Sequence, residues 1–481
     1  MRLTKTGHLI VALILPLLTV SLQVTAQHQE LNEQPNLWKS DSSKPDTRRS
    51  LLQAFQQGKA NGHFRSFLLG TDNAEGLSDY YALAVGGGLR YETAPYHHLQ
   101  FAVSGFYIFD LRSSDLSKPD PASGQLSRYE LGLFDVENPG NKKDLDRLEE
   151  LYLKYSRSNL SVVFGKQLIN TPFINLQDGR MRPTGVEGLH IDYKPHHSIG
   201  VEGGVLYAVS PRSTTRFYTI GESIGVYSPG VGEDGKKSGY PGNLDSRYVS
   251  YLALKASPRK GLQAQVWQMY ADRLFYTAMQ QVDWTSNPRK SGHQFKVGVQ
   301  AIQQFTVGNG GHSESSHAYR SAGSRSFTFG AMAGWQMGST EFNVNYNRIT
   351  AHGRYLMPRE WGRDPFYTFL PRERNEGYGD VHAWMARVSR SFPKAGWRFS
   401  LAGGVYRLPD VKNFRLNKYG MPSYAQVNAD IRYRFRGWLQ GLDAQFLFVA
   451  KPGMGHTYNE ARYRINKVDM MQYNLVLNYR F

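Results

Sequence analysis

The last eleven residues, MQYNLVLNYRF (471–481), alternate between apolar and polar positions. One parity holds the apolar residues Tyr473, Leu475, Leu477, Tyr479 and Phe481. The other parity holds Gln472, Asn474, Asn478 and Arg480, interrupted only by Val476. A repeat of two residues is the period of a β-strand with one apolar and one polar face. We therefore predict that the chain ends on an amphipathic strand.

The same alternation recurs along the chain in eighteen short segments, an even number. Nearly all of them reach the roughly 9–11 residues that a tilted strand needs to cross a bilayer. The predicted strands are 62–70, 79–93, 98–109, 148–156, 160–167, 186–194, 198–209, 247–256, 261–270, 273–285, 293–307, 326–337, 341–351, 379–391, 396–407, 423–435, 440–450 and 470–481.

The connections between these segments fall alternately into a short set and a long set. The short ones are PYHH, RSN, KPHH, SPRK, MGS, FPKA and RGWL. The long ones are 110–147, 168–185, 210–246, 308–325, 352–378, 408–422 and 451–469. Two connections depart from the rule, because Ala271-Asp272 is tight and 286–292 is somewhat long. This segregation is typical of bacterial outer-membrane barrels and not of soluble β-sandwiches.

We therefore predict an all-β fold, an 18-stranded antiparallel transmembrane β-barrel with short periplasmic turns and long extracellular loops. In hydrocarbon every backbone polar group must be satisfied within the protein, so the sheet must close on itself. One face of each strand then meets lipid and the other meets the lumen. In 424–435, for example, Val427 and Ile431 should face lipid, whereas Asn428, Asp430 and Arg432 should face the lumen.

The N-terminus predicts export. Arg2 and Lys5 precede an apolar run from Leu9 to Val20, and small residues follow up to Ala26. This order marks a cleaved signal peptide, and the run is too short for a comfortable membrane anchor. We expect a signal peptide at 1–26, a periplasmic N-terminal segment at 27–60 with a short helix within 50–59, and the barrel at 61–481. The segment is too small for a plug domain, which argues against a gated active transporter.

Composition narrows the chemistry. The chain has no Cys, which excludes disulfides, thiolate metal sites and a Cys nucleophile. Its formal charge is +17, or +15 without the two basic residues of the signal peptide. Because an exported barrel does not meet nucleic acid, anionic solutes and the lipopolysaccharide of the outer leaflet are the better partners. We expect no nucleic-acid partner.

Three stretches resemble the OprD-type outer-membrane porins: DYYALAVGGGLRYETAP (79–95), 148–183 with its GKQxxNTPxxNxxDxRMxP pattern, and EWGRDPFYTFLPRERNEGYGD (360–380). The likeness runs through nearly all of 50–481. It implies a monomeric barrel whose third external loop narrows the lumen, and a C-terminal Phe that the barrel-assembly machinery recognises. It also implies passive uptake of small solutes past a ladder of lumen arginines and lysines facing an acidic patch. Because members differ in solute, the fold does not fix it.

The connection 168–185, the third at the end that carries the long loops, contains two Pro and several Asn, Asp and Gly, a composition typical of a fixed loop. Folded inward, its arginines would attract an anion and its aspartate would hold a cation. Alternatively, these side chains pin the loop to the barrel wall. The residues that we expect at the constriction are Asn170, Asn175, Asp178, Arg180 and Arg182.

The connection 352–377, the seventh at the same end when the tight connections are counted, is rich in Arg and aromatic residues. From the resemblance we expect its RDPFYTFLPRER part in the lumen, although it could instead be an exposed loop that binds lipopolysaccharide. Its candidates for the constriction are Arg363, Asp364, Arg372 and Arg374.

A third group of candidates comes from strand parity. Basic side chains on the polar faces would form a row of weak anion sites along the lumen, or else a structural lattice with nearby carboxylates. This predicted basic ladder comprises Lys154, Lys166, Lys255, Lys296, Arg387, Arg398, Arg432 and Arg434.

Enzymatic motifs are weak. His97-His98 and His196-His197 lie in short turns without chelating partners, and GNGGHS (308–313) lacks the Lys of a phosphate loop. We therefore expect no enzyme, no metal site and no cofactor. The sequence favours a passive, substrate-selective outer-membrane porin for small hydrophilic solutes, with carboxylate-bearing nutrients such as amino acids, short peptides or organic acids preferred. The alternatives are a pore for neutral oligosaccharides and a non-conducting structural or adhesive barrel.

Overall fold

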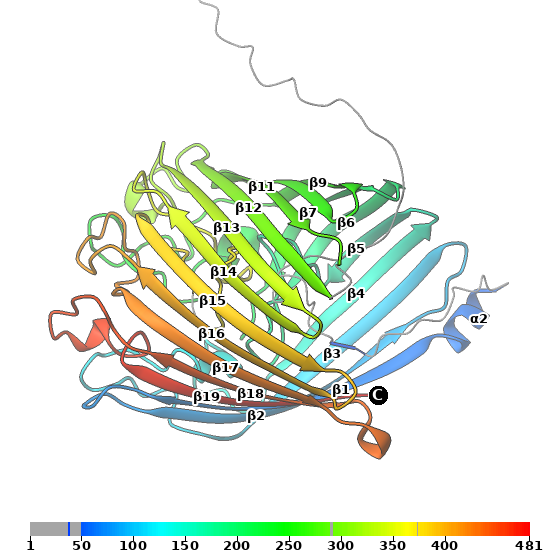
Figure 1. The fold of residues 1–481 in the computed structure, drawn as a ribbon, viewed down its shortest axis with the longest axis horizontal. Coiled ribbons are helices and arrows are strands. Elements are labelled where there is room, and N and C mark those ends of the chain that lie inside the picture. Colours follow the sequence, from blue (N-terminus) through cyan, green and yellow to red (C-terminus); the bar gives the residue numbers. More distant parts are fainter. Residues whose placement is uncertain (1–36, 39–49, 289–291, 373) are drawn as a thin grey trace, which may run out of the picture.

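The computed structural model describes residues 37–38, 50–288, 292–372 and 374–481, so the expected signal peptide at 1–26 lies outside the described residues. All eighteen predicted strands form, within a few residues of their expected bounds, and they make one closed antiparallel sheet (Figure 1). The barrel begins at Lys59, two residues before the expected range.

The strands of the wall are β1 (Lys59–Asp72), β2 (Tyr80–Glu92), β3 (Leu99–Ser113), β4 (Asp146–Arg157), β5 (Leu160–Gln167), β6 (Gly185–His196), β7 (Ile199–Ser210), β9 (Val249–Arg259), β10 (Leu262–Ala271), β11 (Phe275–Thr285), β12 (His293–Thr306), β13 (Arg325–Met337), β14 (Thr340–Ile349), β15 (Val381–Phe392), β16 (Trp397–Arg407), β17 (Tyr424–Arg434), β18 (Leu442–Lys451) and β19 (Met470–Arg480). The two-residue β8 (Tyr218–Thr219) is an extra strand that pairs with β7.

The wall closes where the first strand meets the last. β1 pairs with β19 over ten residue pairs, from His63↔Arg480 to Asp72↔Met471. Gly62 and Phe481 extend the ladder by exchanging backbone hydrogen bonds of 2.9 and 3.1 Å. No edge of the sheet is left unpaired along this seam, as a membrane barrel requires.

Helices are few and short among the described residues. They are α2 (Leu51–Gln56), α3 (Ile220–Ser223) and the 3₁₀ turns η1 (Leu131–Leu133), η2 (Ser315–His317), η3 (Gly437–Leu439) and η4 (Ala461–Tyr463). α2 is the helix expected within 50–59, and the Ser50 hydroxyl caps it by accepting from the backbone N–H of Gln53 at 3.2 Å. Within the described part of the chain, no helix is both long and apolar enough to cross a membrane.

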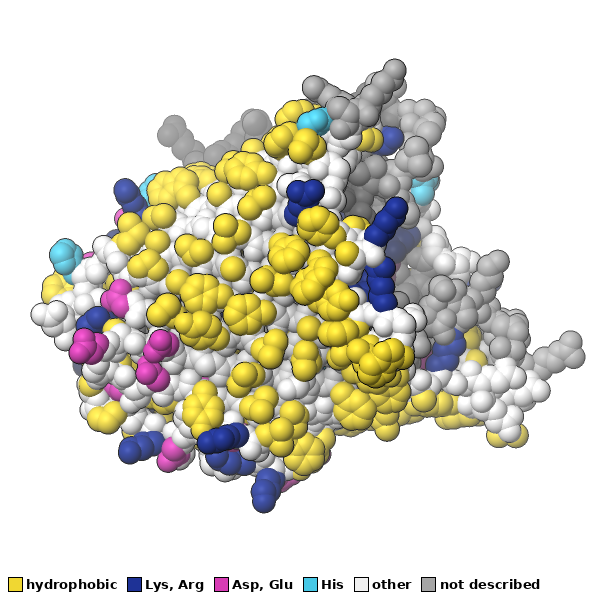
Figure 2. Space-filling view, turned by 60° about the horizontal axis from the view of Figure 1, so that its bottom comes forward, with side chains coloured by type: hydrophobic (Ala, Val, Ile, Leu, Met, Phe, Trp, Pro, Cys, Tyr) yellow, Lys and Arg dark blue, Asp and Glu magenta, His cyan; other side chains and the backbone are white. Residues whose placement is uncertain are grey.

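The alternation predicted for the strands is present in three dimensions. Along β19, Tyr473, Leu475 and Leu477 are exposed on the outside, whereas Gln472 and Asn474 are buried on the inside. Figure 2 shows the outer wall as a field of hydrophobic side chains, with charged groups concentrated toward its edges. The outer surface therefore suits contact with lipid.

Long loops gather at one end of the barrel, and short turns, α2 and the C-terminus lie at the other (Figure 1). We name the long loops L2 (114–145), L3 (168–184), L4 (211–248), L7 (350–380), L8 (408–423) and L9 (452–469). Their apolar side chains are buried in two clusters, and L3 contributes Ile169, Phe173 and Ile174 to one and Met181 to the other. Much of the outer half of the barrel is thus filled by its own loops.

Candidate functional site in the barrel lumen

L3 and L7 lie together inside the barrel. The Asn175 side chain accepts from the backbone N–H of Arg363 and donates to the carbonyl of Arg363, both at 2.9 Å. The Asn175 backbone N–H donates to the Trp361 carbonyl at 3.0 Å. Asn175 is therefore a buried clamp between the two loops, and within L3 Asn170 accepts from the Leu176 N–H at 3.3 Å.

Side chains of the wall hold L7 across the lumen. Gln300 of β12, Tyr406 of β16 and Gln426 of β17 donate to L7 carbonyls at 3.0, 2.7 and 2.9 Å. L7 is therefore an inward loop, as the resemblance implies, and not an exposed one. Its Asp364 accepts from the backbone N–H groups of Asn375 and Glu376, and burial raises the pKa of its carboxyl to about 6.

Three arginines converge on one turn of L3. The Gly179 carbonyl accepts from Arg180 at 2.8 Å and from Arg372 of L7 at 2.9 Å. A Cβ at Gly179 would lie 3.0 Å from Arg372 Nη1 and 3.6 Å from Arg212 Nη1 of L4. We call Arg180, Arg212 and Arg372 the arginine cluster. Sequence reasoning missed Arg212, because nothing in its local pattern shows that L4 reaches L3.

The arginine cluster is electrostatically unbalanced. None of the described residues forms an ion pair with any of its three guanidinium groups, and the Nε atoms of Arg212 and Arg372 are buried without an acceptor. Burial, together with the charge of Arg372, lowers the pKa of Arg180 to about 9. Burial lowers the pKa of Arg212 and Arg372 to about 10. Three like charges meet at this turn and two of their Nε donors lack an acceptor in the described part of the chain, so a bound anion would stabilise the cluster.

Asp178 lies beside the arginine cluster and brings a negative charge close to it. Its carboxylate is 2.6 Å from Arg65 Nη2 of β1, and its side chain is 42% exposed. Burial raises the pKa of this carboxyl, but the charge of Arg65 outweighs that effect and lowers the pKa below its ordinary value. A reachable anionic oxygen therefore adjoins a cationic patch. Arg65 was not predicted, although its inward parity in 62–70 was the available signal.

Arg182 has a structural environment instead. Its guanidinium makes a buried ion pair with Glu149 and donates to His63 Nδ1 at 2.9 Å. It also lies between two rings, with 5.2 Å to the centroid of Trp38 and 4.4 Å to that of Phe106. This residue fits the alternative of pinning the loop to the wall.

Glu149 and Glu150 both point inward although they are neighbours. Strict alternation would send one carboxylate into lipid, but the register between β3 and β4 shifts at this point, between Ser104 and Gly105. A β-bulge allows two successive side chains to face the same side. The two adjacent glutamates at 149 and 150 interrupt the alternation of apolar and polar residues, so this bulge is visible in the sequence.

The remaining L7 candidates are held by their own contacts. Arg374 donates to Gln177 of L3 at 2.8 Å and to the Arg359 carbonyl at 3.1 Å. Arg363 stacks over Phe369, with 5.2 Å from its guanidinium carbon to the ring centroid.

Most residues of the basic ladder face the lumen, but one does not. Lys166 lies opposite Leu151, which is exposed on the outer wall, and its partner Glu187 contacts the exposed Tyr207. The lumen position predicted for Lys166 is therefore wrong. Lys166 shares the parity of Leu160, Val162 and Phe164, and Phe164 is exposed on the outer wall, so strict alternation along 160–167 places Lys166 outside.

Several ladder side chains are paired with carboxylates. The distances between the side-chain nitrogen and the carboxylate oxygen are 2.5 Å for Lys166–Glu187 and for Lys255–Glu202, 2.9 Å for Lys296–Glu341 and for Arg432–Asp430, and 3.4 Å for Arg434–Asp443. Lys154 lies on the inward side of β4, Arg387 is buried and donates to the Phe369 carbonyl, and Arg398 lies opposite Arg432. Apart from Lys166, these residues occupy strands from β4 to β17, so they surround the lumen and do not follow a single line.

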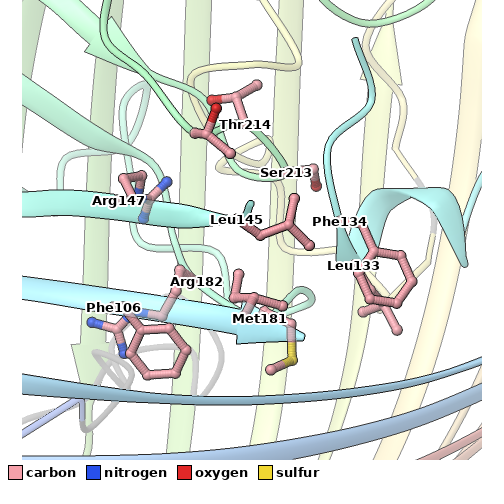
Figure 3. A pocket seen from close by; sticks show the side chains of 11 residues that line it. Phe106, Leu133, Phe134, Leu145, Arg147, Met181, Arg182, Ser213 and Thr214 are labelled. Atoms are coloured by element: carbon pink, nitrogen blue, oxygen red, sulfur yellow. The ribbon is translucent and has the colours of Figure 1, made fainter. Parts of the chain in front are cut away.

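A small cavity lies between L2, L3 and the wall (Figure 3). Its volume is about 10 Å³, and its lining includes Phe106, Leu133, Met181 and Arg182. This volume accommodates about one water molecule and no solute. Among the described residues, no group of three or more His, Cys, Asp or Glu side chains is placed to hold a metal ion.

A closed 18-stranded wall with a lipid-facing exterior and loops folded into a polar lumen defines a transmembrane β-barrel of the outer-membrane type. Solved structures of OprD-type porins share this fold. Pseudomonas aeruginosa OccK9 (OpdG) matches with a TM-score of 0.69 and 15% identity, over 89% of this chain and 99% of that chain. Acinetobacter baumannii OccAB2 matches with a TM-score of 0.67 and 14% identity, over 89% and 99%.

A third match, P. aeruginosa OpdK with vanillate, has a TM-score of 0.66 and 13% identity, over 89% of this chain and 99% of that chain. No protein-family model and no curated protein sequence matches the chain. The shared fold confirms the OprD-type architecture that the sequence resemblance implies, and the lumen residues have to be interpreted on their own chemistry.

Proposed function

We propose that this protein is a passive outer-membrane channel for small hydrophilic solutes and that it prefers solutes bearing a carboxylate. The observation that carries this proposal is the arginine cluster of L3, L4 and L7, which is partly exposed and forms no ion pair with a carboxylate of the described residues. The planar guanidinium fork matches the two oxygens of a carboxylate. The OprD-type fold supports the channel role and a location in the outer membrane.

Asp178 refines the preference. An α-amino acid or a short peptide carries an ammonium group near its carboxylate, so it could contact Asp178 and the arginine cluster together. Beyond the constriction, ladder residues such as Lys255 and Arg432, 44% and 41% exposed, would offer weak successive sites. Weak sites in series let an ion enter and leave without being trapped.

The reversal potential in planar bilayers under a salt gradient tests the charge preference. We expect an anion preference at neutral pH that decreases in Arg180→Met and Arg372→Met. Arg390→Met is the matched control, because Arg390 lies on the outward side of β15 and its loss should leave the selectivity unchanged. A clear cation preference of the native protein would contradict the proposal.

Two alternative functions can be distinguished from this proposal by experiment. A pore for neutral oligosaccharides would admit sugars faster than carboxylates in liposome swelling. A structural or adhesive barrel would show no single-channel conductance, and the two apolar clusters that fill the outer half of the lumen favour this second candidate.

We further propose that the chain is monomeric, that it contacts outer-membrane lipid and lipopolysaccharide, and that the barrel-assembly machinery inserts it.

A further inference from the structure

A short piece of the N-terminal segment lies inside the barrel. Leu37 is only 7% exposed, and Trp38 contacts residues of the lumen. The Trp38 indole N–H donates to Glu150 of β4 at 3.1 Å, and its ring packs edge-on against His63 of β1 at 6.3 Å between centroids. The sequence predicts a periplasmic segment at 27–60, whereas Trp38 lies against side chains of β1 and β4 that face the lumen.

The groups around the Trp38 ring form an ordered site whose side chains contact one another. The guanidinium of Arg182 covers one face of the Trp38 ring. The opposite side of the same guanidinium lies against Phe106, and Figure 3 shows Arg182 beside Phe106. Glu149 and His63 fix the guanidinium from its edges. Glu149 and His63 are 1% and 0% exposed, and Arg182 is 4% exposed. These groups are held by each other, so the site does not depend on Trp38 for its shape.

The chemistry of the site selects one kind of ligand. A guanidinium face attracts an aromatic ring through cation–π contact. The Glu150 carboxylate, 6% exposed, requires a donor and rejects an acceptor. Glu150 also accepts from Arg90 at 3.1 Å and from Ser104 at 2.8 Å, which fix its carboxylate in place.

We propose that these residues form a binding site for a planar aromatic molecule that carries an N–H or O–H donor, and that Trp38 is its intramolecular occupant. The site adjoins the constriction, because Arg182 is two residues from Arg180 and His63 shares Asn478 with Arg65. An aromatic solute that displaces Trp38 would therefore bind directly below L3. The site is separate from the arginine cluster and takes a different class of ligand.

Equilibrium binding of indole to the full-length Trp38→Ala protein in detergent tests this site. Removal of the side chain leaves an indole-shaped space, and a ring of this size should bind with a dissociation constant on the order of 1 mM or below. The native protein, with Trp38 in place, should bind at least about tenfold more weakly. 1-Methylindole, which lacks the N–H donor, should also bind to the variant about tenfold more weakly, because its methyl group faces the buried Glu150 carboxylate and supplies no hydrogen bond to it.

The matched control is Trp438→Ala. Trp438 is 89% exposed in η3, and its loss should create no indole site. Trp38→Phe keeps a ring in place and checks that a changed result does not come from misfolding. Equal binding of indole and 1-methylindole to Trp38→Ala, or equal binding of indole to Trp38→Ala and Trp438→Ala, would overturn the proposal.

Conductance provides a second readout. Single-channel current should increase in Trp38→Ala and decrease again when indole is added, with no such response in Trp438→Ala. This readout rests on the proposed channel function, whereas binding in detergent does not. A barrel that binds indole without conducting would therefore contradict the channel and leave the aromatic site standing.

Discussion

At the residue scale, the same motif supplies groups with opposite roles. Asp178, Arg180 and Arg182 lie within five residues of L3, and from sequence all three are candidates for the pore. In the structure Arg182 is locked by Glu149 and two rings, whereas Arg180 belongs to the arginine cluster. The partners come from β1, β4, L4 and L7, so local sequence cannot distinguish a ligand-binding arginine from a structural one.

The buried pair predicts a large loss of stability. Arg182→Met should lower the free energy of unfolding by about 2–3 kcal/mol, because among the described residues the buried Glu149 then keeps Arg147 as its one cationic partner. Arg432→Met, which removes a 41%-exposed partner of Asp430, should cost about 1 kcal/mol or less. Urea unfolding of both variants in detergent measures the difference. Similar losses would contradict the assigned environments.

Lys418 of L8 predicts a pH dependence. It is 2% exposed and donates to the Tyr240 hydroxyl at 3.1 Å, with the rings of Tyr319 and Tyr419 nearby. Burial lowers the pKa of Lys418 to about 7 and raises the pKa of each of these tyrosines well above its ordinary value.

Because the unfolded chain keeps the Lys418 proton up to its ordinary pKa, folded-state stability should increase with pH above about 7. The slope contributed by this single group is at most about 1.4 kcal/mol per pH unit. Thermal unfolding between pH 7 and 10 should show the rise in the native protein and a flatter profile in Lys418→Met. Identical profiles would refute this role of Lys418.

At the element scale, the strands were predictable because each one must place apolar groups in lipid and polar groups inside. The same rule fails where the register shifts, as at Glu149 and Glu150, whereas for Lys166 strict alternation along 160–167 gives the outward position. The inward folding of L2 was not predictable. Its Leu131, Leu133 and Phe134 pack against strand residues such as Phe67 and Phe106 that face the lumen, and only the closed wall brings these segments together.

Gly165 of β5 is required for the close pairing of β4 and β5 just before L3 begins. Its φ is +121°, and a Cβ there would lie 2.3 Å from the Leu151 carbonyl oxygen of β4. Gly165→Ala should therefore destabilise the β4–β5 pairing that leads into L3 by about 2 kcal/mol or more. Gly200→Ala is the control, because its Cβ would lie 3.9 Å from that of Lys255. The folded fraction on heat-modifiability gels should decrease for the first variant only.

At the scale of the whole molecule, the surplus of positive charge acts over distance. The chain carries a formal charge of +17, and several lumen arginines and lysines are partly exposed. Salt shortens the range of such charges from about 10 Å at 0.1 M to about 3 Å at 1 M. The anion preference should therefore be strongest at low salt and should weaken as the salt concentration increases.

Reversal potentials measured at a fixed concentration ratio between 0.1 M and 1 M would show this trend. A preference that does not change with salt would instead place the selectivity in close contacts at the arginine cluster.

The seam between β1 and β19 also governs when this protein can fold. Its ten residue pairs join the first strand of the wall to the last, so no shorter piece of the chain can make a closed wall. A chain released before Met470 would keep an open edge of unpaired backbone groups, which invites aggregation. Closure of the wall therefore has to wait for β19, the last of its strands along the chain.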